Sequence, residues 1–480
     1  MENQRGTRYG LAYKSGWITQ PQRKLINPAR MGPNGTMKRK SCYAILPLSR
    51  HIILISALFV VCPFSPAQQF HGSLRGTVQD ASQARIPSAT VVLRAAESTS
   101  EVHTLTDARG EFRFDDLIPG NYHLLASAQG FAEARSEVTV MVSSVRDVLV
   151  TMIPGSVEQT VTVLAQAPSI TTAPFDPSSA THQGVVMTQD LQTIPLAARS
   201  FANIAYLVPG TEPVEPSDPT KARITAVSTG GSSGLNNELS VDGGDNSDDY
   251  IGGFLQNFSP DAIQEFAFRT AQMDADTGRT TAGSVVITTK HGTDDWHGDL
   301  AFYERAAALN ARFPIDNPPP NPKQPFSRQN YVATIGGPII KGKLWFFSSF
   351  EAVHEDASIA YSAASQTQFN ALAQLAAQGL VNVNGTVVNS IGVPDNVAVP
   401  FRDYLGTTRF DWAQSSKSQW FLRAAVDNYT THNAFVQQGA LPSTGAESHN
   451  NYMNLVLSQQ YRFGPTWLGE CSCSTRAPCI

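Results

Sequence analysis

Apolar and polar residues alternate with a period of two over much of this chain, which predicts strands rather than helices. Between Gly72 and Met152 the alternation comes in short runs separated by turn residues. Asp107–Gly110 has the composition of a tight turn, and Pro119-Gly120 breaks the chain before the next run. Short strands at this spacing predict a small antiparallel β-sandwich. The predicted strands are Leu74–Val78, Thr90–Arg94, Val102–Thr106, Glu111–Phe114, Tyr122–Ala128, Ser136–Val142 and Val145–Met152.

Longer alternating runs begin at Trp296, and each has one apolar and one polar face. A water-soluble sheet whose apolar face covers a core would explain this pattern. The wall of a transmembrane β-barrel, with lipid outside and a polar lumen inside, would explain it equally well. The alternation alone therefore leaves both interpretations open. The runs lie at residues 296–305, 330–335, 344–351, 408–412, 419–427 and 453–461.

The first 67 residues differ from the rest in charge, because they hold ten of the 35 Lys and Arg residues and a single acid. A basic group at residues 38–40 precedes an apolar run at residues 52–62, and small residues follow. This order predicts a secretory signal peptide cleaved between Ala67 and Gln68, with an over-extended gene start in front of it. The apolar run is shorter than the about 20 residues that a membrane-spanning helix needs.

Without this leader, 25 basic residues face 39 acidic ones, which gives a net charge of −14. Such an acidic chain is a poor partner for nucleic acid, whose phosphates require clustered Lys and Arg. The exported part has no cysteine until Cys471, Cys473 and Cys479, which agrees with an oxidising compartment. These three residues lack the spacing of a metal or redox site, and we interpret residues 471–480 as a frameshifted tail.

The first exported segment resembles the carboxypeptidase regulatory-like domain. The motifs that carry this resemblance are "GTVQD", "IPSATVVL", "TDARGEFRFDDLIPGNYHL" and "AQGF". The resemblance implies an accessory module without an active site, sometimes classed as having a carbohydrate-binding-like fold. His103 and His123 lie in predicted strands and lack the pairing with Glu that would ligate zinc for peptide hydrolysis.

The stretch from Val185 to Thr293 resembles the plug domain of TonB-dependent outer-membrane receptors, specifically the Oar-like group. The motifs are "LQTIPLAARSFANIAYLVPGTEP", "LNNELSVDGGDNSD" and "PDAIQEFAFRTAQMDADTGRTTAGSVVITTKHGTDDWHG". Small residues suit a domain that must slide out of a barrel. The turn Ile194–Phe201 departs from the usual "LPLNGRNF" and lacks two of its polar side chains. The resemblance assigns the plug motif to Asp242, Gly243, Asp261, Gln264, Glu265, Phe266, Gly278, Arg279, Gly283, Thr289, Gly292 and Thr293.

Between the two resemblances lies an extended run that is similar to the TonB box, the short strand that pairs edge to edge with a periplasmic energy-coupling protein. A plain linker strand would explain the same residues. The predicted partners are a TonB-type energy-coupling protein, outer-membrane lipid and an unknown extracellular ligand. The candidate box is Glu158, Gln159, Thr160, Val161, Thr162, Val163 and Leu164.

"GGPIIKGKLWFFSSFEA" also resembles these receptors and favours the barrel interpretation of the runs after Trp296. Trp345, Trp412 and Trp420 would then suit an interfacial aromatic girdle, and residues 357–400 would be loops. Roughly six strands are visible, whereas plugged transporters use about 22. The sequence therefore predicts an N-terminal portion of a receptor.

Two motifs suggest other chemistry. Gly230–Gly234 matches the G-x-S-x-G nucleophile elbow around Ser232, but a strand rather than a helix is predicted after it. Asp242, Asp245, Asp248 and Asp249 could bind calcium, but they lack the ligand spacing of an EF-hand loop. We therefore expect a solvated glycine-rich loop there, and neither an enzyme nor a cofactor.

The sequence thus predicts a mainly β protein: a small antiparallel β-sandwich, then an α+β plug domain, then the first strands of an incomplete transmembrane β-barrel. Its predicted function is energy-coupled uptake of an unknown, carbohydrate-related or other substrate across the outer membrane of a Gram-negative-type bacterium. The alternative is a secreted carbohydrate- or protein-binding adhesion protein. The predicted segments are a leader (1–67), the sandwich (68–153), a linker with the candidate box (154–184), the plug (185–293), the partial barrel (294–470) and the tail (471–480).

Overall fold

A computed structural model describes most of the chain after residue 70. The chain divides into two units, residues 1–63 and 64–480, and every described residue lies in the second. No helix among these residues is long and apolar enough to cross a membrane. The predicted cleavage site at Ala67 and Gln68 lies outside the described residues. Described are residues 71–96, 101–142, 145–155, 161–164, 182–196, 199–214, 226–249, 252–271, 277–278, 280–311, 323–360, 363–392, 396–415, 417–433, 446–464 and 467–478.

The predicted sandwich forms from two sheets, with strand orders β4-β1-β7 and β3-β2-β5-β6-β8. All seven predicted strands are present, and the pairing is antiparallel except between β1 and β7 and between β6 and β8. Apolar side chains from both sheets, such as Leu74, Val91 and Leu124, fill one buried core. The strands are β1 Gly72–Asp80, β2 Thr90–Ala95, β3 Glu101–Leu105, β4 Glu111–Leu117, β5 Gly120–Ser127, β6 Ala134–Val140, β7 Val145–Met152 and β8 Val161–Leu164.

Residues 182–293, which we call the plug, form a mixed five-stranded sheet in the order β13-β12-β15-β14-β9. Strand β15 is buried at every position. It lies between β12 and β14 in the sheet, and both of its faces are covered. Its sequence GSVVITT accordingly lacks a charged residue. The plug elements are β9 His182–Met187, α2 Thr188–Thr193, η1 Phe201–Leu207, β10 Thr211–Val214, β11 Ala226–Thr229, η3 Gly234–Asn236, β12 Asn237–Val241, β13 Gly244–Asp245, η4 Pro260–Ala262, β14 Ile263–Ala271 and β15 Gly283–Thr289.

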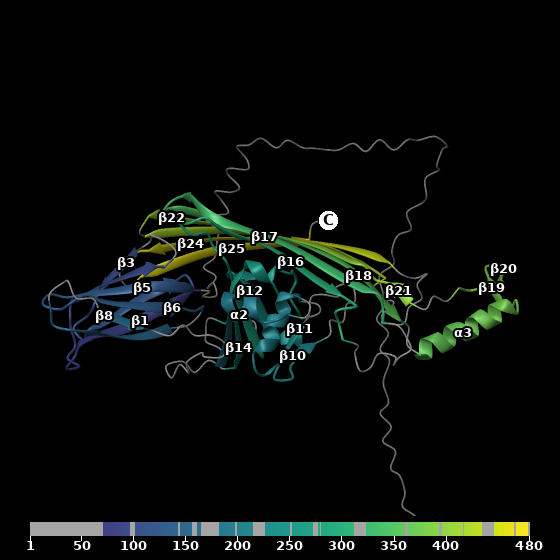
Figure 1. The fold of residues 1–480 in the computed structure, drawn as a ribbon, viewed down its shortest axis with the longest axis horizontal. Coiled ribbons are helices and arrows are strands. Elements are labelled where there is room, and N and C mark those ends of the chain that lie inside the picture. Colours follow the sequence, from purple (N-terminus) through teal and green to yellow (C-terminus); the bar gives the residue numbers. More distant parts are fainter. Residues whose placement is uncertain are drawn as a thin grey trace, which may run out of the picture. The chain divides into compact units, whose positions relative to one another are not determined.

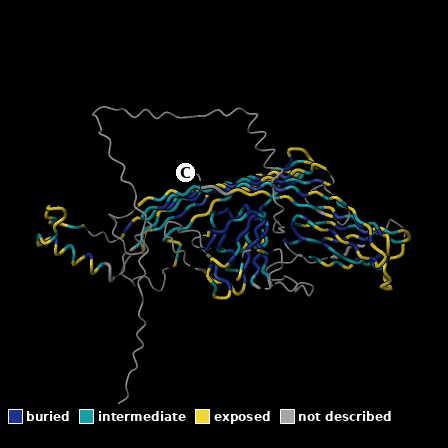
Figure 2. Tube along the Cα trace, turned by 180° about the vertical axis from the view of Figure 1, so that it is seen from behind, coloured by how far each residue is buried: buried dark blue, intermediate teal, exposed yellow. Residues whose placement is uncertain are grey.

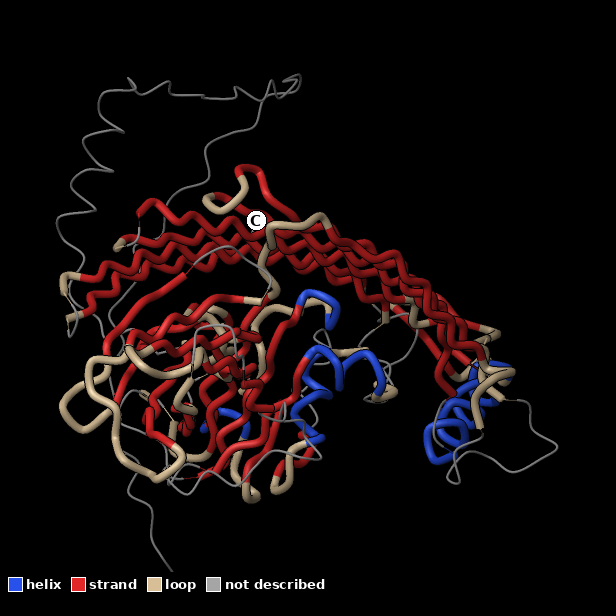
Figure 3. Tube along the Cα trace, turned by 60° about the vertical axis from the view of Figure 1, so that its left-hand side comes forward, coloured by secondary structure: helices blue, strands red, loops and turns tan. Residues whose placement is uncertain are grey.

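The remaining long strands form one antiparallel sheet, which we call the wall, in the order β16-β17-β18-β22-β23-β24-β25 (Figure 1). Its strands run side by side over their full length (Figure 3). The wall strands are β16 His297–Ala306, β17 Phe326–Ile340, β18 Leu344–Ala360, β22 Phe401–Ser415, β23 Ser418–His432, β24 Glu447–Arg462 and β25 Leu468–Pro478, with β21 Asn396–Ala398 paired to β18.

Connections at the two ends of the wall differ in length. Residues 341–343, 416–417 and 463–467 make short connections at one end, and residues 307–325, 361–400 and 433–446 make long ones at the other. Transmembrane barrels have this asymmetry, with short periplasmic turns and long extracellular loops. The longest connection was predicted as loop, and this was wrong in part, because it holds α3 Ala363–Ala377 and the hairpin of β19 Val381–Val383 and β20 Thr386–Val388.

Strand β25 extends the wall through residues of the predicted tail. It pairs antiparallel with β24 from Tyr452 opposite Pro478 to Arg462 opposite Leu468. Cys471 and Cys473 are exposed on this strand and form no disulfide. The frameshift itself stays a prediction, because a strand pairing does not report the reading frame.

Buried, intermediate and exposed positions are mixed along the strands of the wall (Figure 2). On β22 the buried residues include Asp403, Arg409 and Asp411, while Phe410 and Trp412 between and beside them are about 40% exposed. A soluble sheet would bury the aromatic side chains and expose the charges. The outer face of the wall is therefore apolar, and its charged residues face inward beside apolar ones such as Phe347 and Phe401, as in a barrel that faces lipid.

The predicted aromatic girdle stays a prediction for Trp412 and Trp420 and is wrong for Trp345. Trp412 is exposed on the outer face, near the end of β22 with the short connection. Trp345 lies on the inner face of β18, is only 7% exposed, and donates its indole N–H to Asp294 over 2.8 Å. The period-two alternation explains the difference, because Trp345 shares its face with Glu351 rather than with Phe350.

Candidate functional site

The contact between the plug and the inner face of the wall centres on Asp242. Asp242 and Gly243 form the two-residue turn between β12 and β13, with Val241 paired to Gly244. Both turn residues have positive φ, +48° and +74°, which is the Asp-Gly signature of a type I′ hairpin. The Asp242 carboxylate is fully buried and accepts hydrogen bonds from the Thr289 backbone N–H (2.9 Å) and hydroxyl (2.8 Å). The turn thus aims a fixed carboxylate out of the plug sheet.

Two buried arginines of the wall meet this carboxylate. Arg409 on β22 and Arg423 on β23 are direct cross-strand partners and both point inward. Arg409 Nη1 lies 3.1 Å from Asp242 Oδ1, and Arg423 Nε lies 2.9 Å from Asp242 Oδ2. Like charges directly opposite each other destabilise a strand pair. Asp242 therefore supplies, from the plug, the negative charge that this pair of wall strands needs.

Further polar partners surround the two arginines. Asp411 binds Arg409 Nη2 at 2.8 Å, so that two carboxylates face two guanidinium groups. Arg423 Nη2 donates to the Val241 carbonyl at 3.0 Å and to Asn454 Oδ1 at 2.8 Å. Buried charges are tolerated only when they are paired and hydrogen-bonded in this way. We call Asp242, Arg409, Arg423 and Asp411 the clamp.

A second contact lies around Glu351 of β18. Its carboxylate accepts hydrogen bonds from Ser259 of the plug and from Asn330 of β17. In the altered turn at residues 194–201, Arg199 pairs with Asp261. The Arg199 guanidinium also lies 3.6 Å from the ring centre of Tyr303 on β16. The plug is therefore held to the wall by polar contacts on several strands.

The predicted plug-motif residues lie in several different environments. Asp242 and Thr289 meet in the clamp, and Asp261 meets Arg199 beside Glu351. Glycines serve close approach: a Cβ on Gly292 would lie 2.3 Å from the Phe346 carbonyl oxygen, and one on Gly283 would lie 2.6 Å from Thr229 Oγ1. Gly278 has open space around it, and Arg279 lies outside the described residues.

The acidic loop that was expected to be solvated is largely buried. Asp242 is 0% and Asp248 6% exposed, Asp245 is partly buried and Asp249 is exposed. The expectation was wrong for Asp242 because its turn packs against the wall, where Arg409 and Arg423 take the place of water. Around Ser232, strand β11 is followed by the short turn η3 and by β12, so the helix that a nucleophile elbow needs does not follow it.

Glu265 is the buried carboxyl group of the plug motif that the clamp does not use. It lies on β14, is 0% exposed, and accepts a hydrogen bond from the Val142 backbone N–H at 2.7 Å. Burial raises the pKa of Glu265 to about 8, and the single hydrogen bond offsets only part of that shift. Its neighbours Gln264 and Phe266 lie on the same strand, and the side chain of Phe266 belongs to the plug core.

The candidate TonB box falls partly inside the described residues. Val161–Leu164 is strand β8, which pairs in parallel with Ala134–Glu137 of β6. Strand β8 is the last strand of its sheet, so its other backbone edge has no strand beside it within the described part of the chain. Glu158, Gln159 and Thr160 lie outside the described residues.

Two segments of the chain match known protein families. Residues 73–153 match the carboxypeptidase regulatory-like domain, and residues 288–377 match an outer membrane beta barrel domain. The chain is therefore a mainly β outer-membrane protein of the Gram-negative type, with a regulatory-like domain in front of barrel strands. This confirms the predicted fold class and localisation.

The chain is also similar to one particular protein. The chain is similar to the TonB-dependent transporter Oar of Myxococcus xanthus, with 29% identity over 291 residues. That alignment covers 57% of this chain and 26% of Oar, so the chain spans about a quarter of its relative. The predicted resemblance to the Oar-like receptors is thereby confirmed.

Two solved structures are also similar to this chain. The outer membrane transporter YddB from Escherichia coli gives a TM-score of 0.45 at 9% identity, covering 61% of this chain and 38% of that one. A mutant of the ferric enterobactin receptor from Pseudomonas aeruginosa gives a TM-score of 0.41 at 12% identity, covering 61% and 40%.

Proposed function

We propose that this chain is the N-terminal portion of a TonB-dependent transporter, in which the plug is a gate held by the clamp. The observation that carries the proposal is the Asp242 carboxylate of the plug between two buried arginines of the wall. A gate must be held firmly and yet be movable, and polar contacts can exchange for water when the plug shifts. The relative Oar is a transporter rather than an enzyme, which agrees with a non-catalytic role.

Coupling would act through residues 158–164. A strand that offers a backbone edge is the element to which an energy-coupling protein can add its own strand. Because this segment precedes β9, a pull on it would reach the plug sheet through residues 165–181. The proposed partner is therefore a TonB-type energy-coupling protein, powered by the proton gradient.

The proposal includes the segment boundaries predicted from the sequence and an extracellular ligand that binds the long connections of the wall. A carbohydrate-related ligand is one candidate, because the regulatory-like domain is classed with carbohydrate-binding-like folds. The secreted adhesion protein is less well supported, because the wall exposes aromatic side chains and buries charges. It would also require release of the protein into the medium.

The gate can be tested without knowing the substrate. Ser240 of β12 is 2% exposed beside the clamp, and a cysteine there would be shielded while the plug stays in place. We would replace Cys471, Cys473 and Cys479 by serine, introduce Ser240→Cys, and treat cells with a membrane-impermeant maleimide. Labelling should rise in energised cells and disappear with a proton-gradient uncoupler.

A matched variant tests the coupling strand. Val163→Pro removes a backbone N–H from β8 and prevents strand addition. Combined with Ser240→Cys, it should abolish the energised labelling while the amount of protein in the outer membrane stays the same. Equal labelling with and without the proton gradient would contradict the proposal.

A further inference from the structure

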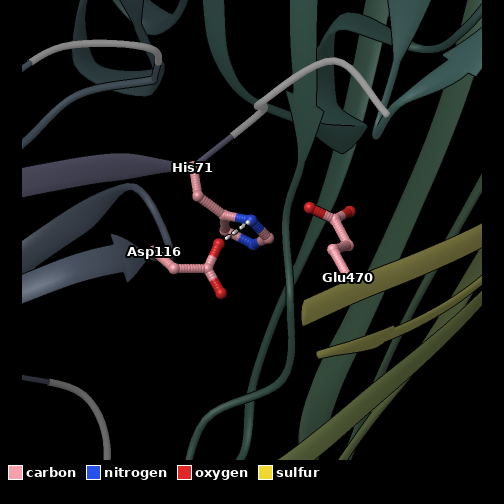
Figure 4. A group of neighbouring side chains, drawn as sticks. All are labelled: His71, Asp116 and Glu470. Atoms are coloured by element: carbon pink, nitrogen blue, oxygen red, sulfur yellow. Dashed lines mark ion pairs between the residues drawn. The ribbon is translucent and has the colours of Figure 1, made fainter. Parts of the chain in front are cut away.

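A group of side chains that could ligate a metal lies beside the clamp, with His71 buried and Asp116 and Glu470 partly buried. His71 directly precedes β1, Asp116 lies on β4, and Glu470 lies on β25, and Figure 4 shows the three side chains converging. One ligand atom from each lies within 4.8 Å of the others. His71 is only 5% exposed, although it carries an imidazole that water would normally solvate. The group therefore joins the sandwich to the last strand of the wall.

Several polar contacts surround His71. His71 Nδ1 lies 3.0 Å from Asp116 Oδ1. The Gln460 amide nitrogen lies 2.7 Å from His71 Nδ1, 3.3 Å from His71 Nε2 and 3.0 Å from Asp116 Oδ1. A nitrogen this close to both ring nitrogens lies over the face of the imidazole, so the in-plane lone pair of a ring nitrogen is free of it. These contacts hold the imidazole and the Asp116 carboxylate together beside Gln460.

A cation could bind to the three converging side chains together. It accepts the imidazole lone pair and both carboxylates, and it accepts the Gln460 amide oxygen when that amide is turned over. Four ligands at about 2.0 Å around a tetrahedral ion lie roughly 3.3 Å apart, close to the separations within this group. Two carboxylates and one imidazole also carry a net negative charge unless a cation is present. One nitrogen and several oxygen donors suit a borderline ion of the Zn²⁺ class.

A cavity of about 160 Å³ gives an ion access to the group. His71, Asp116, Ser458 and Gln460 form part of its lining, together with Arg409 and Asp411 of the clamp. The ligands of the wall, Gln460 and Glu470, are direct cross-strand partners on β24 and β25. They lie beside the short connection 463–467, at the end of the wall that we assign to the periplasm. An ion could therefore enter from that compartment.

We propose that His71, Asp116 and Glu470, with Gln460, form a divalent transition-metal site that fastens the sandwich to the wall. The inference is independent of transport, because it concerns the resting contact between these two parts. The bound ion would be structural, since each protein ligand lies on a strand or directly before one.

The test is metal binding by the full chain in detergent micelles. After chelator treatment, Zn²⁺ titrated by calorimetry should bind at one equivalent per chain. His71→Ala and Glu470→Gln should each weaken binding at least tenfold, since loss even of an outer-shell partner costs about 10- to 100-fold. His103→Ala is the matched control, because His103 lies 3.8 Å from Glu101 on an exposed strand of the same sandwich. It should leave the affinity unchanged.

A second readout separates binding from misfolding. Zn²⁺ should slow amide hydrogen exchange in residues 111–117 and 468–478 together, because the ion joins β4 to β25. Asp116→Asn keeps the side-chain shape and should abolish this joint protection while the metal-free exchange pattern persists. Absence of stoichiometric Zn²⁺ binding, or binding that survives both His71→Ala and Glu470→Gln, would overturn the proposal in favour of a plain hydrogen-bonded group.

Discussion

The strands of the sandwich and of the wall share the same alternation of apolar and polar residues. The sandwich buries its apolar side chains, whereas the wall buries its charged ones and exposes large apolar ones. In the sandwich Leu74 and Val91 are fully buried, and charged residues such as Arg113 point outward. In the wall Arg409 and Arg423 are fully buried, while Leu300 is 84% exposed. The period of the pattern thus defines the strands in both regions, whereas the medium outside and the partner inside decide which face is covered.

The largest effect should come from emptying the clamp. Asp242→Ala leaves Arg409 and Arg423 opposite each other, buried and short of one negative charge. Breaking a buried ion pair from one side costs about 3–5 kcal/mol. We expect a loss of that size in the free energy of unfolding, measured by denaturant titration with tryptophan fluorescence in micelles.

A matched acid in the same loop provides the control for the clamp. Asp249→Ala changes an exposed residue and should alter the unfolding free energy by less than about 0.5 kcal/mol. If both substitutions have equal effects, the clamp does not hold the plug. Protease accessibility of the plug should rise for Asp242→Ala alone.

The contrast between the two regions can be tested with leucine. Leu74→Ala removes a fully buried side chain of the sandwich and should cost about 2–5 kcal/mol. Leu300→Ala removes a side chain that faces detergent, so the measured unfolding free energy should hardly change. A similar loss for both would mean that the outer face of the wall is covered by protein.

A charge on the outer face tests whether that face meets lipid. Leu422 lies on β23 between Phe410 and Leu457 of the neighbouring strands, within the apolar band. Leu422→Arg should cost about 2–4 kcal/mol in a bilayer, and less in water-rich micelles. Asn428→Arg, on the same exposed face beyond the apolar band, should cost about 0–1 kcal/mol. Equal tolerance of both in vesicles would favour a soluble sheet.

Sequence reasoning predicted the strands well because their period and turn residues are local signals. All seven sandwich strands and the main wall strands lie where the alternation placed them. The orientation of Trp345 was available from the same alternation, since it shares a face with Glu351. Helix α3 was missed because residues 363–377 have only a weak helical periodicity and lie inside a long connection.

The clamp could not be predicted in full, because its residues come from distant segments. Asp242 belongs to the predicted plug motif, and Arg409 and Arg423 lie in the alternating runs 408–412 and 419–427. Their meeting depends on the register that places Arg409 opposite Arg423 and on the positive-φ turn at Asp242. The sequence does show a positive charge on the polar face of each of two neighbouring strands. Two such charges facing inward require a buried acidic partner.

The smallest and most gradual effect should be the pH dependence that Glu265 introduces. Its pKa of about 8 in the folded protein lies above the value of an unfolded glutamate, so the folded chain keeps a proton that the unfolded chain releases. This contribution to stability is therefore fully present below about pH 4.5 and is lost as the pH rises toward 8, by at most about 1.4 kcal/mol per pH unit.

Asp107 of the sandwich shows the opposite sign, because the backbone N–H groups of Glu111 and Arg109 lower its pKa. Glu265→Gln should remove the decline between pH 5 and 8 in unfolding curves, and Asp107→Asn should leave that decline in place. A decline that persists in Glu265→Gln would show that another group of the plug titrates there.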